Sequence, residues 1–306
     1  MNLVSVTLGE LVDAALQGLQ GPPELGRRIV LGTTINTSAT TYQVSDATLL
    51  NATDILEWDD ELHFVTDKTD DTATATLTVV RAYAGTTARA HTAGDVGTIN
   101  PRFSRHQVQR TVMQAFPYLE ANRLPLVATS AEAAATVDPN FERVLILTVP
   151  AEARHVYLTR SGLYEIPNCR YIDNLPAADY PTGKVVRLPR FALGTDALFS
   201  FVYSTPYRWT PNPPVDETAT IEMVEGSTDV PVAYTIWQLV SDRETSRRQI
   251  DRSEEFPNQL NGESGLALVR LKQNEFYACL DAARRLNPPP KRRQYIGRAR
   301  YWGGHD

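Results

Sequence analysis

The chain has 306 residues, of which 42% are hydrophobic and 22% are charged. This length and balance are typical of a soluble globular protein with one large domain or two to three small ones. The formal net charge of −6 argues against a nucleic-acid-binding protein, because such proteins usually carry a basic surface.

The sequence has no feature of a secreted or membrane-inserted protein. No window approaches the ~18 consecutive apolar residues of a membrane span. The first residues lack the basic region and long apolar run of a signal peptide. The two cysteines, Cys169 and Cys279, lie far apart and suit reduced core thiols in a protein that folds in the cytosol.

A helix is predicted near the start of the chain, within residues 1–25. Thr7 and Glu10 have the spacing of a capping box, in which each side chain bonds the other residue's backbone N–H. Apolar residues then recur at helical spacing until Gly18 and the Gly21-Pro22-Pro23 run: Leu8, Leu11, Val12, Ala15, Leu16 and Leu19.

Residues 26–103 are predicted to form a small β-domain of short strands separated by Asp, Asn, Thr and Gly. The expected strands are 28–31, 41–44, 55–58, 61–66 and 75–80. Apolar residues also alternate from Leu56 to Phe64. They would share one strand face if the strand ran through Asp60 without interruption.

The remaining chain is predicted to hold a central helix, a second β-rich region and two further helices. The central helix, within 104–122, starts at a Ser104–Gln107 cap and breaks at Pro117. In the β-rich region 123–215, strands are expected at 144–149, 156–160, 184–188 and 198–203. Region 216–287 should be helical, from near Asp229 and over 264–286, followed by an extended tail over 288–306.

The last helix should bury one stripe of its surface. Its apolar residues at near-helical spacing are Leu266, Val269, Phe276 and Leu280. Together these elements predict an α+β fold: a helical core of N-terminal, central and two C-terminal helices, carrying one or two inserted antiparallel β-domains and an extended C-terminal tail.

No motif in the sequence indicates a reaction, a metal or a cofactor. The five histidines never occur at a spacing of three or four, and neither a nucleophile elbow, a P-loop nor a G-x-G-x-x-G fingerprint is present. The acidic run from Asp54 to Asp71 lacks the frame of an EF-hand loop. It is interpreted as a solvated face with turns, and a cation site stays as the alternative.

The segment VRAYAGTTARAHTAGDVGTINPRF, residues 80–103, is the most informative in the chain. It is predicted to be a β-turn-β unit in which Gly85 supplies a permissive backbone and Thr86 and Thr87 bond free amides. Its sequence pattern resembles the RGY-x-GTTA-x-x-H-x-x-G segment of structural proteins of tailed bacteriophages. Here Ala82 stands in the glycine position and Arg89 lies between Ala88 and Ala90.

The order of elements also resembles head-to-tail connector proteins, in particular the adaptors that dock beneath the portal. The resemblance implies a non-enzymatic virion protein in the neck between capsid and tail, made in the host cytoplasm. It further implies a homo-oligomeric ring, a dodecamer in the family, with the portal and a downstream neck or tail protein as partners. DNA would pass through such a ring without specific binding, which the net negative charge and the acidic run suit.

Residues 288–306 are interpreted as a partner-binding tail. It begins with three prolines and then combines basic with aromatic side chains, which anchor many interfaces. Family adaptors place this segment on the portal, so the expected portal contacts are Lys291, Arg292, Arg293, Tyr295, Arg298, Arg300, Tyr301 and Trp302. DNA contact and a free solvated tail stay open as alternatives.

Two other functions remain open from the sequence. The chain could be a minor tail or baseplate component of the same kind of particle. It could instead be a glycan-binding or glycan-degrading tail protein that uses the aromatic and acidic β-regions. Catalytic, cofactor-binding and metal-binding residues are expected to be absent.

Overall fold

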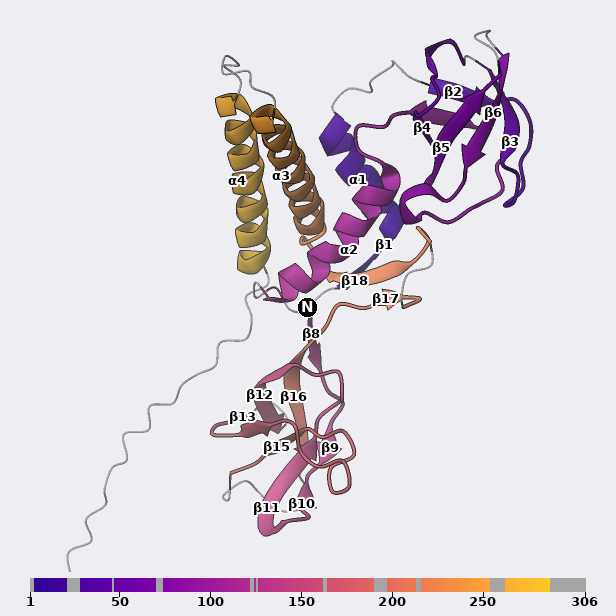
Figure 1. Ribbon diagram of the computed structural model, residues 1–306. Helices are drawn as coiled ribbons and strands as arrows, with labels where there is room; N and C mark the ends of the chain where they lie inside the picture. Colours follow the sequence, from indigo (N-terminus) through magenta and orange to yellow (C-terminus); the bar gives the residue numbers. More distant parts are fainter. Residues whose placement is uncertain are drawn as a thin grey trace, which may run out of the picture.

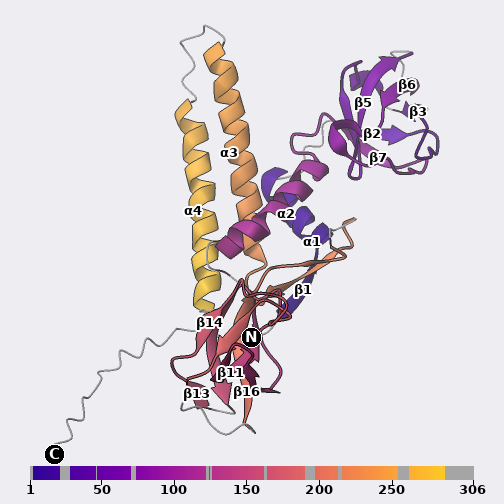
Figure 2. The same ribbon diagram turned by 60° about the horizontal axis from the view of Figure 1, so that its bottom comes forward.

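The computed structural model describes residues 3–20, 28–45, 47–69, 74–121, 124, 126–161, 164–189, 197–212, 216–253 and 262–286. In these residues the chain forms three regions, which we call the body, the barrel and the sandwich (Figure 1). The barrel and the sandwich lie on different sides of the body in both views (Figures 1 and 2).

The body combines a three-stranded sheet with four helices around one hydrophobic core. Its sheet has the order β1-β18-β17, so it joins the start of the chain to a segment more than two hundred residues later. Helices α3 and α4 lie side by side (Figures 1 and 2). The elements are β1 (Leu3–Thr7), α1 (Leu8–Gln20), α2 (Arg105–Ala121), β17 (Trp209–Thr210), β18 (Thr220–Val224), α3 (Asp229–Ser253) and α4 (Gly262–Leu286).

Both predicted helix caps are confirmed. The Glu10 N–H donates to Thr7 Oγ1 at 3.1 Å, while the Thr7 N–H donates to Glu10 Oε2 at 2.8 Å, which completes the capping box. At the start of α2, the Gln107 N–H donates to Ser104 Oγ at 3.1 Å. The predicted break at Pro117 is wrong, since α2 continues to Ala121. Burial of flanking residues in the body's core holds this helix together across the proline.

The predicted buried stripe of α4 is right at its C-terminal half and wrong at its start. Phe276 and Leu280 are buried, and the Phe276 ring stacks on Trp237 with 5.4 Å between centroids. Leu266, however, is 37% exposed. Among the described residues, no helix is both long and apolar enough to span a bilayer.

The barrel is a closed six-stranded sheet with its own hydrophobic core. The strand order around the barrel is β2-β3-β6-β5-β4-β7, and because the sheet is closed no strand edge is left unpaired. Gly97 makes room for the buried Trp58 ring, because a Cβ at this position would lie 2.7 Å from Trp58 Cε3. The strands are β2 (Arg28–Leu31), β3 (Thr41–Ser45), β4 (Ile55–Trp58), β5 (Glu61–Lys68), β6 (Thr74–Val80) and β7 (Val96–Ile99).

The sandwich packs two antiparallel sheets face to face. One has the order β10-β11-β15-β14, and the other has the order β13-β12-β16-β8 with β9 also paired to β16. Alternate residues of β16, Phe199, Phe201 and Tyr203, enter the core shared by the sheets. The strands are β8 (Leu126–Thr129), β9 (Ala133–Ala134), β10 (Thr136–Asp138), β11 (Phe141–Thr148), β12 (His155–Ser161), β13 (Tyr164–Ile166), β14 (Arg170–Ile172), β15 (Val185–Arg187) and β16 (Leu198–Thr205).

The predicted fold class is wrong. Strand accounts for 36% of the structure and helix for 31%, and the chain forms a closed barrel and several sheets rather than a helical core with inserted β-domains. The prediction of the fold class relied too much on the long stretches of helical periodicity and too little on the short strands. Short strands such as β1, β17 and β18 carry little signal alone, yet they build the sheet on which the helices pack.

Candidate functional site

The hairpin of β4 and β5 decides which side chains point into the barrel. Its two-residue turn is Asp59–Asp60, and across it Trp58 pairs with Glu61 and Leu56 with His63. Directly opposite residues share a face of the sheet. Since Trp58 and Leu56 belong to the barrel core, Glu61 and His63 also point inward, and both have an exposure of 0%.

This geometry corrects the face expected from the sequence. The alternation from Leu56 to Phe64 assumed one strand through Asp60, which would have placed Leu62 and Phe64 inward. The turn interrupts that strand, so in β5 the odd-numbered residues Glu61 and His63 point inward and not the even-numbered ones. A carboxylate and an imidazole are therefore buried where apolar side chains were expected.

The Glu61 carboxylate accepts five hydrogen bonds inside the barrel. Its Oε1 accepts from Arg81 Nε at 2.9 Å and from the Ala82 N–H at 3.2 Å. Its Oε2 accepts from Arg81 Nη2 at 2.6 Å, from the Arg89 N–H at 2.9 Å and from His91 Nε2 at 2.9 Å. The bidentate pair with Arg81 matches a guanidinium fork to a carboxylate.

The donors come from the connection between β6 and β7, the segment that resembles phage structural proteins. Because β6 and β7 are not neighbours in the barrel, this connection crosses between them and is not the predicted hairpin-like unit. Arg81 also donates to the backbone carbonyls of Asn36 and Arg89. His91 forms a β-bridge with Ile35, so the crossing segment is fixed to the barrel at several points.

The GTT turn is used differently from the prediction. Gly85 has a φ of 84°, as expected of a permissive glycine. Thr86 Oγ1 accepts from the Leu62 N–H of β5 at 3.1 Å and donates to the Tyr83 carbonyl at 3.0 Å. The threonine therefore joins the turn to a neighbouring strand. Ala82, at the glycine position of the resembling motif, has a φ of 51°, where a glycine would be unstrained.

A second chain of hydrogen bonds leads into the same centre. Trp58 Nε1 donates to Tyr42 Oη at 3.2 Å, and Tyr42 Oη lies 2.6 Å from His63 Nδ1. His63 Nε2 lies 3.0 Å from Glu61 Oε1. The neutral imidazole carries one proton, on the nitrogen that faces Glu61 or on the one that faces Tyr42. Burial lowers the pKa of His63, in agreement with the neutral form.

The electrostatics of Glu61 keep it ionised. Burial alone would raise its pKa, but the contacts from His63, His91 and Arg81 outweigh burial and hold the pKa well below its usual value. The centre therefore contains one carboxylate paired with one guanidinium.

Glu61, His63 and His91 could supply three ligand atoms to a metal ion, all within 4.8 Å of one another. The donor set does not suit a cation, because the Arg81 guanidinium lies 2.6 Å from Oε2 and already neutralises the carboxylate. Glu61 and His91 are also buried, with exposures of 0% and 2%. The polar centre is suited to holding the barrel together.

A cleft of about 660 Å³ lies between the barrel and the body. It carries two arginines, Arg89 and Arg105, and five carboxylates: Glu57, Asp59, Asp60, Asp216 and Glu217. Arg105 forms a bidentate pair with Glu217, with both nitrogen–oxygen distances at 2.6 Å, and it also bonds Asp13 of α1 at 2.7 Å. Burial raises the pKa of Glu57 to about 7, although the carboxylate accepts the Arg105 N–H.

The predicted acidic run does not act as one unit. Asp54 accepts the N–H of Asn51 and the side-chain amide of Asn100, and Asp60 forms an ion pair with Arg89. Glu57 and Asp59 line the cleft, Glu61 faces the barrel interior, and Asp67 is exposed and accepts the Lys68 N–H. Asp70 and Asp71 lie outside the described residues. In the part of the chain that the structure describes, these carboxylates serve turns and ion pairs at separate positions.

All the predicted portal contacts lie outside the described residues: Lys291, Arg292, Arg293, Tyr295, Arg298, Arg300, Tyr301 and Trp302. The sequence analysis missed the buried centre of Glu61, His63 and Arg81. The Asp59-Asp60 pair between two alternating runs was the available signal, because such a pair can form a two-residue turn.

Comparison with known proteins adds no assignment. Neither the models of known protein families nor the curated proteins include a match to this chain.

Proposed function

We propose that the chain is a structural, non-catalytic protein of a tailed-phage particle, a head-to-tail adaptor at the neck. The observation that supports a structural role is the use of the phage-like segment itself. Its Arg81 and His91 are committed to the buried Glu61 carboxylate, so the residues of the motif that could perform chemistry bind protein instead. The resemblance of that segment supports the assignment to a virion.

The proposed partners are copies of the same chain in a ring, the portal and a downstream neck or tail protein. The segment from Lys291 would contact the portal, with its arginines meeting acidic groups and its aromatic side chains supplying buried area. DNA would pass through the ring. The formal net charge of −6 suits a conduit that does not retain phosphate.

Labelling of purified particles tests the location. Antibodies against the purified chain should bind at the neck, in a copy number that matches a ring. Label at the tail tip or baseplate would support the alternative of a minor tail protein. Particles that contain none of the chain would refute both virion assignments.

Deletion of residues 291–306 tests the docking segment. The shortened protein should melt as the full chain does and should no longer join DNA-filled heads. A matched control replaces the five basic residues of this segment by glutamine and keeps the aromatic side chains. If the deleted protein still yields infectious particles, portal binding must use another surface.

A further inference from the structure

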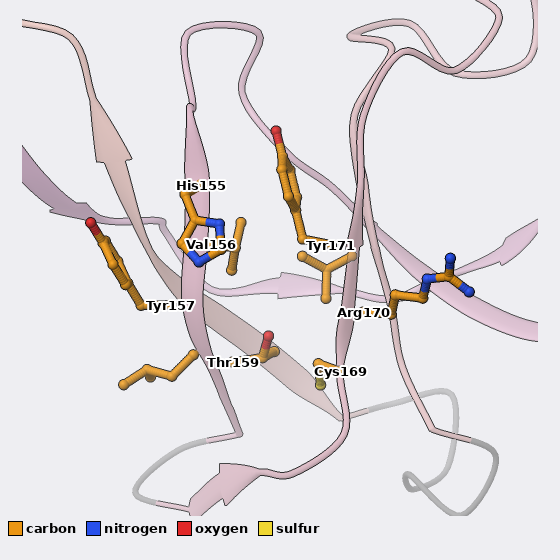
Figure 3. Close-up of a pocket in the computed structure, with 9 residues that line it drawn as sticks. His155, Val156, Tyr157, Thr159, Cys169, Arg170 and Tyr171 are labelled. Carbon is orange, nitrogen blue, oxygen red and sulfur yellow. The ribbon is translucent and has the colours of Figure 1, made fainter. Parts of the chain in front are cut away.

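The sandwich contains a cavity that its fold does not explain. It has a volume of about 280 Å³ and lies between β12 and the strands β14 and β15 of the facing sheet (Figure 3). This is far more than the ~30 Å³ that one water occupies in the liquid. It is close to the lower end, ~300 Å³, of pockets that hold small molecules.

Two buried hydroxyl groups lie at this cavity. Tyr171 Oη has no hydrogen-bond partner within the described protein. Thr159 Oγ1, on a residue that is 1% exposed, has the Cys169 thiol as its one polar neighbour among the described residues. Buried polar atoms are nearly always paired, so an unpaired one that lines a cavity is free to bond a water, ion or ligand held there. Both hydroxyls can donate as well as accept.

A β-bulge in β12 accompanies the cavity. The pairing with β16 shifts register between Val156 and Leu158, and the residue between them is Tyr157, which lines the cavity. Bulges re-aim side chains and recur next to binding sites. In Figure 3 the Tyr171 ring lies to the right of β12, above the shorter side chains of Thr159 and Cys169, and the Tyr157 ring lies to the left of this strand.

The cavity favours an uncharged ligand. Burial raises the pKa of the Cys169 thiol and of the Tyr171 hydroxyl, which keeps both groups neutral. Arg170 is exposed, and Figure 3 shows its guanidinium directed away from the other labelled side chains.

The aromatic rings supply an apolar wall next to these hydroxyls. The His155 ring lies edge-on to Tyr171, with 6.2 Å between centroids, and to Tyr157 at 5.1 Å. A ligand that fits has several hydroxyl groups and one face of C–H groups. We propose that this cavity binds a neutral monosaccharide, with Thr159 and Tyr171 bonding its hydroxyl groups and the aromatic side chains covering its apolar face.

Saturation-transfer NMR of the full chain with glucose, galactose, mannose and N-acetylglucosamine tests the proposal. At least one sugar should bind with a dissociation constant in the low-millimolar range or tighter. Thr159→Val and Tyr171→Phe should each weaken that binding by roughly tenfold, because each removes one hydrogen bond to the ligand. Matched controls at exposed positions, Thr136→Val and Tyr164→Phe, should leave binding unchanged.

Three outcomes would overturn the proposal. The first is that none of the four sugars binds in that range, which would leave ordered water as the occupant of the cavity. A sugar binds, but the Thr159 and Tyr171 variants bind it as the controls do, which would place the site elsewhere. Both variants melt normally and bind more tightly than the unmodified chain, which would show that the hydroxyls oppose the ligand. None of these outcomes depends on where the chain lies in a particle.

Discussion

The barrel and the sandwich both bury polar groups, but they treat them differently. In the barrel, Glu61 receives five hydrogen bonds from protein groups. In the sandwich, the Tyr171 hydroxyl has no partner within the described residues, and Thr159 Oγ1 has only the Cys169 thiol. A buried carboxylate with a full set of donors specifies structure, whereas an unpaired hydroxyl that lines a cavity is free to bond what the cavity holds.

The sandwich is able to satisfy a buried carboxylate elsewhere. Asp138 is 1% exposed, and it accepts from Tyr180 Oη at 2.6 Å, from the Asn140 N–H at 3.0 Å and from Arg187 Nε at 3.0 Å. The lack of partners at the cavity is therefore local to β12 and β14 and not a general property of the sandwich.

The largest expected effect comes from breaking the polar centre of the barrel. Arg81→Met leaves the buried Glu61 carboxylate without its counter-ion, which should cost roughly 3–5 kcal/mol of stability. Hydrogen exchange measured on peptides from β5 and β6 should show the loss. Arg160→Met, at an exposed position of the sandwich, should stay within about 0.5 kcal/mol. Unchanged protection in β5 and β6 would mean that the network does not stabilise the barrel.

A similar loss of stability, introduced in the body, tests whether the three regions unfold independently. Phe276→Ala removes a fully buried ring from the body's core and should cost roughly 3–5 kcal/mol. Because the barrel and the sandwich have separate cores, their peptides should keep their exchange protection. Leu271→Ala, on the same helix but 53% exposed, is the control. Loss of protection in all three regions together would show a single cooperative unit.

A smaller effect concerns Glu57, the barrel carboxylate whose pKa is raised, in contrast to Glu61, whose pKa is lowered. Glu57, at the cleft, has its pKa raised from 4.5 to about 7, so its neutral form is favoured in the folded chain. Its contribution to stability is therefore greatest below pH 4.5, falls as the pH rises to about 7 and stays low above that. The groups that face it are Arg105, Asp60 and Glu217.

Glu57→Gln keeps an acceptor for the Arg105 N–H and removes this titration. Above pH 7 the variant should be more stable than the unmodified chain by up to about 3 kcal/mol, and near pH 4 the two should agree. Urea unfolding followed across this pH range gives the difference. A constant difference at every pH would contradict the raised pKa.

The smallest effect concerns the backbone of the phage-like segment. Ala82 has a φ of 51°, which costs an alanine roughly 1–2 kcal/mol. Ala82→Gly should relieve this cost, less the greater flexibility of glycine in the unfolded chain, for a net gain of about 1 kcal/mol. Ala90→Gly, on an exposed residue of the same segment, should give no gain. Equal changes in the melting temperature of the two variants would argue against strain at Ala82.

Much of the local structure could be predicted from the sequence. The Thr7–Glu10 capping box, the Ser104 cap and the positions of strands such as β5, β12 and β16 follow from short-range patterns. The burial of Phe276 followed from helical periodicity. These features depend on neighbouring residues, which is why a single sequence contains them.

The buried centre and the fold class could not be predicted in the same way. Whether Glu61 or Leu62 points inward depends on a two-residue turn, and a change of one residue reverses every side chain in the strand. The pairing of β1 with β18 depends on residues at the two ends of a long stretch of chain. The cavity beside Thr159 depends on how two sheets meet, for which the sequence carries no local signal.

The pairing of β1 with β18 also sets an order of events during synthesis. A ribosome releases Leu3 first, but its partner Val224 follows only after every strand of the barrel and the sandwich has emerged. Domains fold as units while the chain is being made, so these two regions can fold before the body has its sheet. Until then the apolar face of α1, with Leu8, Leu11 and Val12, lacks the sheet and the later helices that will cover it. During synthesis, the N-terminal segment with α1 is therefore the part of the chain that stays accessible to chaperones for the longest time.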